Sequence, residues 1–443
     1  MKFRVGREAL GEAVGWVARA LPARPVVPVL SGLLLDAGED GLTLSCFDYE
    51  VAARIQVEAE VLEAGTALVP GRLLAEITRS LPARPVQFSS DNSDVDMTCG
   101  SAEFTLVSLP AEDYPALPEP PQPAGTVEST ALATAVSQVV PAASRDDTLP
   151  MLTAVCLDVD GETLTLAATD RYRLAVRELR WQPATPGIRA VAMVPARTLA
   201  DFARTMTPGV PVTISFGVGE GAAPGQAARE PRPADGMISF EADRRRLIAR
   251  LIGGEFIRYR SRFPDEFGCQ AELPAGPVIE AVRRVSLVAE RASPVRLSFG
   301  AGQVVIEARA EGRARAVETV AAQFSGTEPV ISFNPHYLLD GLTAAAASGP
   351  ARLPAGDAAE PGAGHGGEPA GSGRIRLEFT SPAKPALITW ARRAAHGDGD
   401  GHGDGHGDDQ DDGGRDDGDR GADADGPPPF RYLLVPLRVP ARA

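Results

Sequence analysis

A short polar cluster lies between two apolar runs near the middle of the chain. The stretch ATDRYRLAV, residues 168–176, contains one Asp, two Arg and one Tyr. Side chains of these types can take part in catalysis, contact nucleic acid, or form a turn between strands. The stretch alone leaves all three interpretations open, so the elements around it have to decide.

The sequence lacks the motifs expected of an enzyme. It contains no GxxxxGK[ST] loop, no GxGxxG after a strand, no GxSxG elbow and no HExxH helix. His336 is the only His outside the low-complexity segments. A His-based general acid or base with a Ser or Cys partner is therefore hard to assemble. We expect no catalytic residues, no cofactor and no enzymatic activity.

Metal binding has one candidate, the run HGDGHGD with His396, His402 and His406. Its Asp and His side chains could bind divalent cations weakly, but Gly at every second or third position leaves no preorganised ligand geometry. We expect a solvated loop, with a metal-dependent enzyme as the alternative hypothesis. The four cysteines lie far apart without CxxC spacing, which predicts neither a disulfide framework nor a zinc site.

The negative charge of the chain is concentrated in one segment. The net charge is −15, and residues 396–427 contain twelve Asp and two Arg. Three segments rich in Gly, Ala, Pro or Asp predict flexible surface insertions, because they bury too little apolar surface to offset chain entropy. These segments are Gly217–Gly236, Pro350–Arg374 and His396–Pro429.

One plan of helix, hairpin, strands, helix and strands occurs three times along the chain, which predicts a triplicated domain. Each block opens with an amphipathic helix, in which apolar residues recur at spacings of three and four. The expected first helices are Arg7–Pro22, Ser129–Arg145 and Val278–Arg291, the hairpins are Leu30–Asp48, Leu152–Asp170 and Val295–Gly312, and the second helices lie within Val69–Pro82, Val194–Met206 and Phe333–Ala344.

The repeat predicts an α+β fold of three domains, with two helices per domain on one face of a predominantly antiparallel sheet. Pro-rich stretches at Pro115–Gly125 and Ala271–Pro277 indicate interdomain linkers. The expected domains are residues 1–125, 126–270 and 271–443.

Arginines recur on equivalent helices of this acidic protein. Such a shared basic surface suits sequence-independent contact with phosphate backbones. The alternative is solvated helical Arg that pairs with Glu or Asp. The candidate DNA-facing residues are Arg24, Arg72, Arg79, Arg145, Arg197, Arg204, Arg283 and Arg284.

The chain shows no sign of membrane insertion or export. No apolar stretch reaches the ~18–20 residues that cross a bilayer. The N-terminal MKFRVGREAL has no charged, apolar and cleavage regions of a signal peptide. We expect a cytoplasmic protein without a membrane partner.

Several stretches together resemble the bacterial DNA polymerase sliding clamp, the β subunit of DNA polymerase III. They are MKFRV, RPVVPVLSGLLLDA, SLPAEDYP, DDTLPMLTAVCLD, ATDRYRLAV, IGGEFIRYRSRFP, FNPHYLLDGL and YLLVPLRV. The resemblance implies three similar domains per chain and a head-to-tail homodimer, a ring that encircles duplex DNA. It implies a non-catalytic processivity factor that tethers the replicative DNA polymerase and is opened by a separate clamp loader.

The resemblance also implies two kinds of contact site. The replicative polymerase, the loader and other proteins with a clamp-binding motif would insert a short peptide, with a glutamine and a terminal Leu-Phe, into an apolar pocket. That pocket would use Leu152, Thr169, Arg171, Tyr172, Arg173, Leu174, Ile257, Tyr337, Ala383, Pro385, Leu433, Val435, Pro436 and Leu437. The ring interface would use Phe104, Leu106 and Leu287.

Two further hypotheses remain open at this point: a specialised second copy of the clamp, and a peptide-binding scaffold that no longer encircles DNA. The insertions in the third block motivate the first of these. Within ATDRYRLAV, the Asp recurs as Asp48 in CFDYEVAAR of the first block, which indicates a structural turn. Arg171, Tyr172 and Arg173 are specific to the second block, so we expect them to contact partner peptides.

Overall fold

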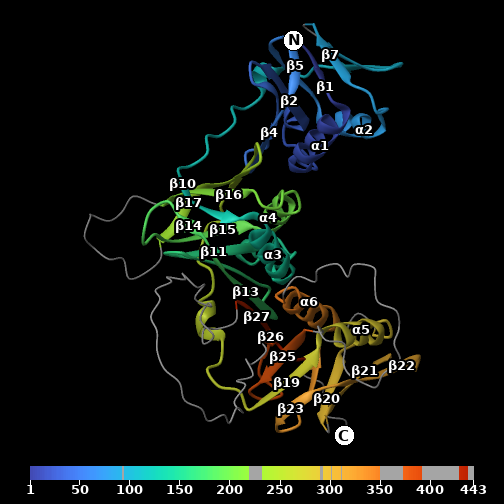
Figure 1. The fold of residues 1–443 in the computed structure, drawn as a ribbon, viewed down its shortest axis with the longest axis vertical. Helices are drawn as coiled ribbons and strands as arrows, with labels where there is room; N and C mark the ends of the chain where they lie inside the picture. The colour runs from blue at the N-terminus through green and yellow to red at the C-terminus, as the bar shows by residue number, and fades with distance from the viewer. Residues whose placement is uncertain are drawn as a thin grey trace, which may run out of the picture. The chain divides into compact units, whose positions relative to one another are not determined.

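The computed structural model describes residues 1–91, 94–218, 232–289, 293–300, 302–310, 312–349, 373–391 and 429–437 (Figure 1). The chain divides into two compact units. The first comprises Met1–Asp265 and Tyr432–Val435, and the second comprises Glu266–Arg431 and Pro436–Ala443. The predicted HGDGHGD loop lies outside the described residues.

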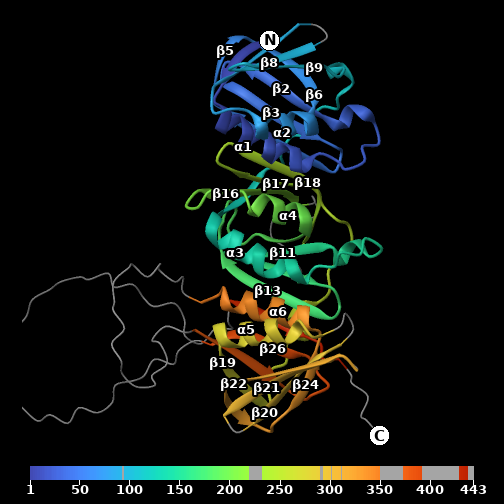
Figure 2. The same ribbon diagram turned by 90° about the vertical axis from the view of Figure 1, so that its right-hand side faces the viewer.

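The first domain contains eleven helices and strands in the order strand, helix, five strands, helix, three strands. They are β1 (Lys2–Val5), α1 (Arg7–Val17), β2 (Gly32–Gly38), β3 (Gly41–Phe47), β4 (Val51–Val57), β5 (Ala59–Glu63), β6 (Gly65–Pro70), α2 (Gly71–Ser80), β7 (Val86–Ser90), β8 (Asp94–Cys99) and β9 (Ala102–Val107). One antiparallel sheet has the order β5-β1-β7-β8-β9. The other pairs β6 with β2, β2 with β3 and β3 with β4. Helices α1 and α2 contact each other and lie together on one side of the domain (Figure 2).

The second domain repeats the same eleven elements. They are β10 (Pro123–Glu128), α3 (Ser129–Val139), β11 (Ala154–Asp160), β12 (Thr163–Thr169), β13 (Arg173–Arg180), β14 (Gln182–Pro183), β15 (Arg189–Pro195), α4 (Ala196–Ala203), β16 (Pro211–Val218), β17 (Arg232–Ala242) and β18 (Arg245–Arg250). The pairings repeat as well, with β14, β10, β16, β17 and β18 in one series and β15, β11, β12 and β13 in the other.

The third domain, in the second unit apart from the end of its last strand, has the same order again. Its elements are β19 (Cys269–Pro274), α5 (Ala275–Ser286), β20 (Val295–Gly300), β21 (Gln303–Ala310), β22 (Ala314–Ala321), β23 (Gln323–Gly326), β24 (Val330–Phe333), α6 (Pro335–Ala346), β25 (Arg374–Phe379), β26 (Ala386–Ala391) and β27 (Phe430–Leu434). Strands β24, β20, β21 and β22 form one sheet, and β23, β19, β25 and β26 pair in the other. The structure thus confirms the α+β class and the threefold plan.

Burial follows the sequence pattern on the helices. On α1 the apolar positions Leu10, Val14 and Val17 are fully buried, as their spacing requires. Side chains cap two helices: the Glu128 carboxylate accepts hydrogen bonds from the first backbone amides of α3, and Asn334 does the same for α6. No helix among the described residues is long and apolar enough to cross a membrane.

Several sequence-based boundaries are wrong. The expected helix Arg7–Pro22 ends at Val17, and the expected helix Val278–Arg291 runs instead from Ala275 to Ser286. The last residues of the expected linker Pro115–Gly125 belong to β10, which begins at Pro123.

The expected helix Ser129–Arg145 ends at Val139, and a short 3₁₀ turn containing Pro141 follows, because proline has no amide hydrogen to continue the helix. The expected linker Ala271–Pro277 is instead β19 and the first turn of α5. The outer parts of the expected loop Gly217–Gly236 belong to β16 and β17, while residues 219–231 lie outside the described residues.

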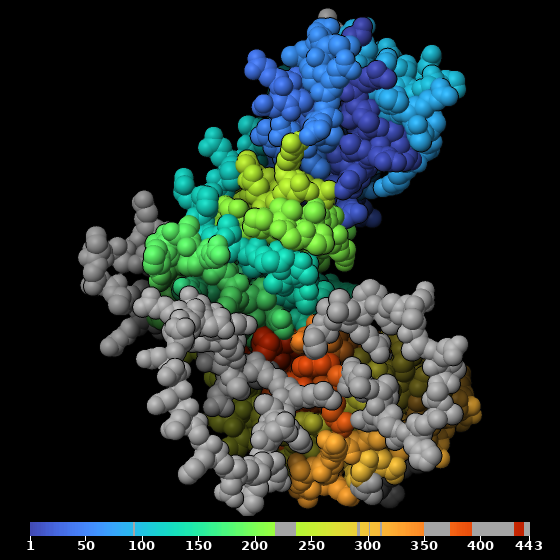
Figure 3. Space-filling view, viewed as in Figure 1, coloured from blue at the N-terminus to red at the C-terminus, as the bar shows by residue number. Residues whose placement is uncertain are grey.

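Two domains of the first unit share a continuous antiparallel sheet. Strand β18 of the second domain pairs with β4 of the first, from Arg245 opposite Ile55 to Ala249 opposite Val51. In Figure 3 the yellow-green residues of this part of the second domain lie against blue residues of the first. The indole N–H of Trp16 on α1 also donates a 2.8 Å hydrogen bond to the Thr205 hydroxyl just after α4.

Candidate nucleic-acid interface and partner pocket

A basic groove lies between the first and second domains, within the first unit. It has a volume of about 460 Å³ and is lined by residues that follow α1, by one face of α2 and by α4. Four arginines line it, Arg19, Arg72, Arg79 and Arg197, together with three acidic residues, Asp48, Glu76 and Asp201. The arginines come from three separate segments of chain, which the domain junction brings together.

The four groove arginines are exposed, and none has a carboxylate within ion-pair distance in the part of the chain that the structure describes. The Arg72 guanidinium donates to the carbonyl of Pro22 at 3.0 Å, which orients it along the groove. Asp201 is already paired with Arg204, at 2.6 Å. The groove therefore offers unpaired cations to an anion, as a phosphate backbone requires.

The other predicted DNA-facing arginines lie in different surroundings. Arg24 is exposed in the loop after α1. Arg145 does not end α3 as expected but lies in an exposed loop beyond the 3₁₀ turn Val140–Ala142. Arg204 is the C-cap of α4 and is paired with Asp201. Sequence reasoning missed Arg19, although its position at the end of the first helix, like that of Arg24, was an available signal.

The arginines of the third domain are engaged by carboxylates. Arg284 on α5 contacts Glu318 of β22 through two nitrogens, at 2.5 Å and 3.1 Å, and lies 3.7 Å from Glu280. Arg283 pairs with Glu280. The hydrogen bonds from Arg284 hold the pKa of Glu318 below its ordinary value, and those same bonds raise the pKa of Arg284. Both arginines of this helix therefore have the carboxylate partners that the alternative interpretation expects.

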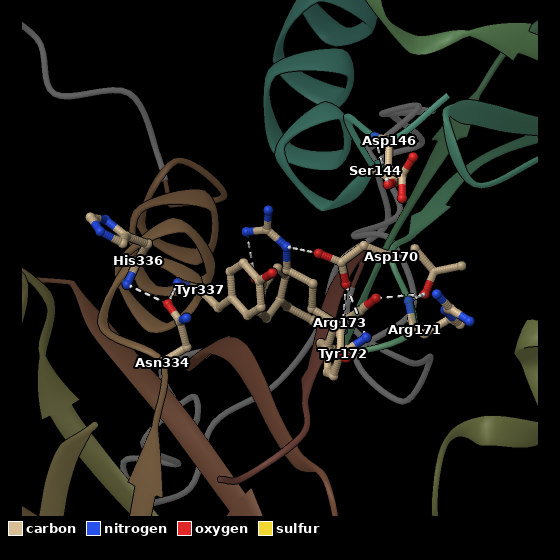
Figure 4. Close-up of polar contacts among 11 residues, drawn as sticks. Ser144, Asp146, Asp170, Arg171, Tyr172, Arg173, Asn334, His336 and Tyr337 are labelled. Carbon is tan, nitrogen blue, oxygen red and sulfur yellow. Dashed lines mark hydrogen bonds and ion pairs between the residues drawn. The ribbon is translucent and has the colours of Figure 1, made fainter. Parts of the chain in front are cut away.

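The ATDRYRLAV stretch folds as a turn between β12 and β13. One oxygen of the Asp170 carboxylate accepts hydrogen bonds from the backbone amides of Tyr172 and Arg173, both at 3.0 Å (Figure 4). Its other oxygen accepts from the Arg173 guanidinium at 2.9 Å. Arg171 adopts the left-handed conformation, with φ of 78°. The Asp thus builds the turn, as its recurrence in the first block indicated.

The side chains of the turn divide into a buried and an exposed set. Arg173 is buried and also lies 3.4 Å from the hydroxyl of Tyr432, so it supports the turn from inside. The Thr169 hydroxyl donates to the Arg173 carbonyl at 2.6 Å and accepts from the Arg171 amide. Tyr172 is 56% exposed. Tyr172 and Arg171 are therefore the side chains of the turn that a partner can reach, which Thr169 and Arg173 are not.

Nine of the fourteen predicted pocket residues belong to the first unit and five to the second. In the first unit, the amide of Val435 donates to the carbonyl of Tyr172 at 2.9 Å, which holds the end of the chain beside the turn. Leu152, Leu174 and Leu433 are buried, Ile257 is half-buried and Val435 is exposed. In the second unit, Tyr337 on α6 and Pro385 are half-buried, Pro436 is buried, and Ala383 and Leu437 are exposed.

The segment that carries Ile257 is held by a buried carboxylate. The hydroxyl of Tyr259 donates to Asp158 on β11 at 2.7 Å, and Arg260 pairs with the same oxygen at 3.0 Å. Burial, reinforced by the negative charge of Asp158, raises the pKa of the Tyr259 hydroxyl. Tyr259 therefore stays protonated and fixes the position of Ile257 two residues away.

The described residues contain no group of three or more His, Cys, Asp or Glu that could hold a metal ion. All four cysteines are free and buried. Burial raises the pKa of the Cys46 thiol to about 12, so this sulfur is a poor nucleophile at neutral pH.

Family models match most of the chain. The N-terminal, central and C-terminal domains of the DNA polymerase III beta subunit match residues 1–118, 126–257 and 260–350, respectively. The beta sliding clamp of Streptomyces coelicolor is 44% identical over 99% of this chain and 100% of its own length. The beta sliding clamp homolog GriR of Streptomyces muensis is 44% identical over 77% of this chain and 88% of its own length.

Solved structures agree in fold. The Bacillus subtilis DNA polymerase sliding clamp matches with a TM-score of 0.75 at 22% identity, over 99% of each chain. The Pseudomonas aeruginosa clamp bound to griselimycin matches with a TM-score of 0.74 at 23% identity, over 99% of this chain and 100% of that one. The chain belongs to the DNA polymerase III beta subunit family, the sliding clamps of DNA replication.

Proposed function

We propose that two copies of this chain close head to tail into a ring around duplex DNA. The ring is a non-catalytic processivity factor that a clamp loader opens, and it tethers the replicative polymerase and other motif-bearing proteins through the pocket beside β13. The arginine groove supplies sequence-independent contacts to DNA phosphates.

The pairing of strands at the domain junctions supports the ring. The eleventh element of one domain pairs with the fifth element of the preceding domain. One eleventh element and one fifth element are left without such a partner in another domain. Strand β18 pairs with β4, and β27, whose residues Tyr432–Leu434 belong to the first unit, pairs with β13. Among the described strands, the equivalent β9 pairs only with β8, and the equivalent β22 only with β21. Unpaired edges invite pairing with another chain. Pairing β9 of each copy with β22 of the other closes six domains into a ring.

Side chains at these edges suit an interface. On β9 the exposed side chains are Glu103, Thr105 and Val107, and Phe104 is half-buried. Leu106, predicted to lie in the interface, is 2% exposed within its own domain, because its place in the strand points it into the core. It therefore supports the edge from inside. Leu287, the C-cap of α5, which packs against β22, is 84% exposed and is therefore accessible to a second copy.

Mass measurement in solution tests the ring. We expect a dimer at micromolar concentration, and a Leu287→Asp variant should be monomeric because a carboxylate would be buried in the interface. Leu62→Asp, at a residue 65% exposed on β5, is the matched control and should stay dimeric. A monomeric wild-type chain, or a dimer that fails to support loader-dependent processive synthesis on nicked circular DNA, contradicts the proposal and favours a scaffold without DNA encirclement.

Peptide binding tests the pocket. An acetylated peptide with a glutamine and a terminal Leu-Phe should bind the wild-type chain, and Leu174→Asp should abolish binding by placing a charge in the apolar wall. Leu62→Asp again serves as the control with the same change of charge. Unchanged affinity in Leu174→Asp would remove the pocket from the proposal without affecting the ring.

A further inference from the structure

The turn that forms part of the proposed pocket has a counterpart in the first domain. Asp48 accepts hydrogen bonds from the amides of Glu50, at 3.0 Å, and Val51, at 2.7 Å, as Asp170 does in the second domain. Tyr49 has a φ of 74°, close to that of Arg171. The two turns therefore share their Asp hydrogen bonds and a left-handed second residue, which aligns Phe47 with Thr169 and Ala52 with Leu174.

The strands that lie beside these two turns, β18 and β27, correspond in the same way. The amide of Arg250 donates to the carbonyl of Glu50 at 2.8 Å, and the amide of Val435 donates to the carbonyl of Tyr172 at 2.9 Å. Counting back two residues from each donor makes Ile248 the counterpart of Leu433. The first domain junction therefore repeats the backbone of the pocket wall, with Ile248 opposite Ala52 in β18 and β4.

At the junction of the first and second domains, the space that corresponds to the pocket is filled by side chains of the chain itself. Phe47, Ala52 and Ile248 form one buried apolar cluster, and Leu117 of the connection to the second domain packs against it. Phe47 replaces the smaller Thr169, so its ring fills space at the start of the turn. At the rim, Arg250 pairs with Glu50 at 3.3 Å.

A tyrosine hydroxyl makes a hydrogen bond that anchors each interdomain connection. Tyr114, three residues before Leu117, accepts a 2.7 Å hydrogen bond from the amide of Phe47, which draws its connection onto the turn. Tyr259 instead binds Asp158, which lies opposite Thr165 in the sheet. Thr165 is four residues before Thr169, roughly 13 Å along the strand, so this connection is anchored away from the turn.

We propose that the first junction contains a second copy of the partner-peptide site, occupied by the chain's own Tyr114–Leu117 segment. Its ligand class is a short peptide with an aliphatic anchor, here supplied in cis by Leu117. Intramolecular occupancy excludes partner peptides, because a tethered segment competes at high effective concentration. The inference rests on the peptide pocket of the proposed function.

Calorimetric stoichiometry with the acetylated Gln and Leu-Phe peptide tests this. Wild type should bind one peptide per chain. Phe47→Thr with Leu117→Ser should bind two, the second more weakly, and adding Ile248→Asp should return the number to one. Leu62→Ser is a control of equal polarity change and should bind one.

The outcomes separate the two proposals. Wild type that binds no peptide overturns the pocket of the proposed function and this inference with it. One peptide per chain in both wild type and the folded double variant overturns this inference alone.

A milder variant covers the case in which the double variant does not fold. In Leu117→Ala, amide hydrogen exchange across Phe47–Ala52 should be faster than in wild type. Excess peptide should slow it again. Exchange that the peptide leaves unchanged in this segment overturns the inference.

Discussion

The arginines of the first domain junction and those of α5 look alike in sequence and differ in what they touch. Arg72 and Arg197 line the groove without a carboxylate partner among the described residues. Arg283 and Arg284 are held by Glu280 and Glu318. Three similar domains therefore carry unequal cationic surfaces.

The difference has a direct physical consequence for DNA binding. A phosphate that approaches the groove meets guanidinium groups that no carboxylate neutralises among the described residues, and binding releases counterions from DNA. A phosphate that approaches α5 competes with Glu318, which already takes two donors of Arg284. The threefold plan of the backbone therefore does not extend to its electrostatics, and we expect DNA to contact the first junction most strongly.

The largest expected effect comes from the groove. Arg72→Ala with Arg197→Ala removes two unpaired cations, so ring retention on nicked circular DNA should fall by about tenfold, and the salt dependence of retention should become shallower by about two phosphate contacts. Arg4→Ala with Arg180→Ala is a control with the same change of charge outside the groove. Retention that falls equally in both pairs would mean that net charge, not the groove, governs binding.

The same exchange on α5 should matter less. Arg283→Ala with Arg284→Ala removes cations that carboxylates already neutralise, so retention in the same assay should fall only about twofold. An equal loss of retention in this pair and in the groove pair would contradict the expected difference between the groove and α5.

The sequence predicted the elements better than their ends. Buried positions such as Leu10 and Val14 reveal helices because helical period is a local property. The end of α3 was missed although Pro141 is visible in the sequence, since apolar spacing was extended past it. The Pro-rich Ala271–Pro277 was mistaken for a linker because Pro274 and Pro277 also suit a strand end and a first helical turn.

Only those features of the site that recur between the sequence blocks could be predicted from the sequence. The recurrence of Asp48 and Asp170 identified a turn, and hydrogen bonds of both carboxylates confirm it. The pairing of Arg284 with Glu318 was invisible, because the two residues are far apart in sequence and meet only through packing of α5 against β22. The burial of Leu106 likewise depends on which face of β9 meets the core.

Releasing an α5 arginine should produce a small gain. Glu318→Gln removes the carboxylate that binds Arg284, so ring retention at low salt should rise, by about twofold, toward the behaviour of an unpaired arginine. Glu60→Gln, at an exposed residue of β5 with no ion-pair partner among the described residues, makes the same charge change and leaves the Arg284 pair intact. Equal gains in both variants would assign the effect to net charge.

The smallest expected effect is the pH dependence of that pair. Arg284 lowers the pKa of Glu318 below its ordinary value of 4.5, so the folded state binds this proton less readily than the unfolded state does. Stability from the pair is therefore fully present above the ordinary pKa and is lost as the pH falls through the lower folded value. Because Arg284 is 56% and Glu318 30% exposed, solvent screens the pair and its contribution should be small. Urea unfolding of wild type and Glu318→Gln should show a stability difference at pH 6 that shrinks below pH 4.5, whereas a difference that is constant with pH would mean that Glu318 stabilises the domain by packing and not by its charge.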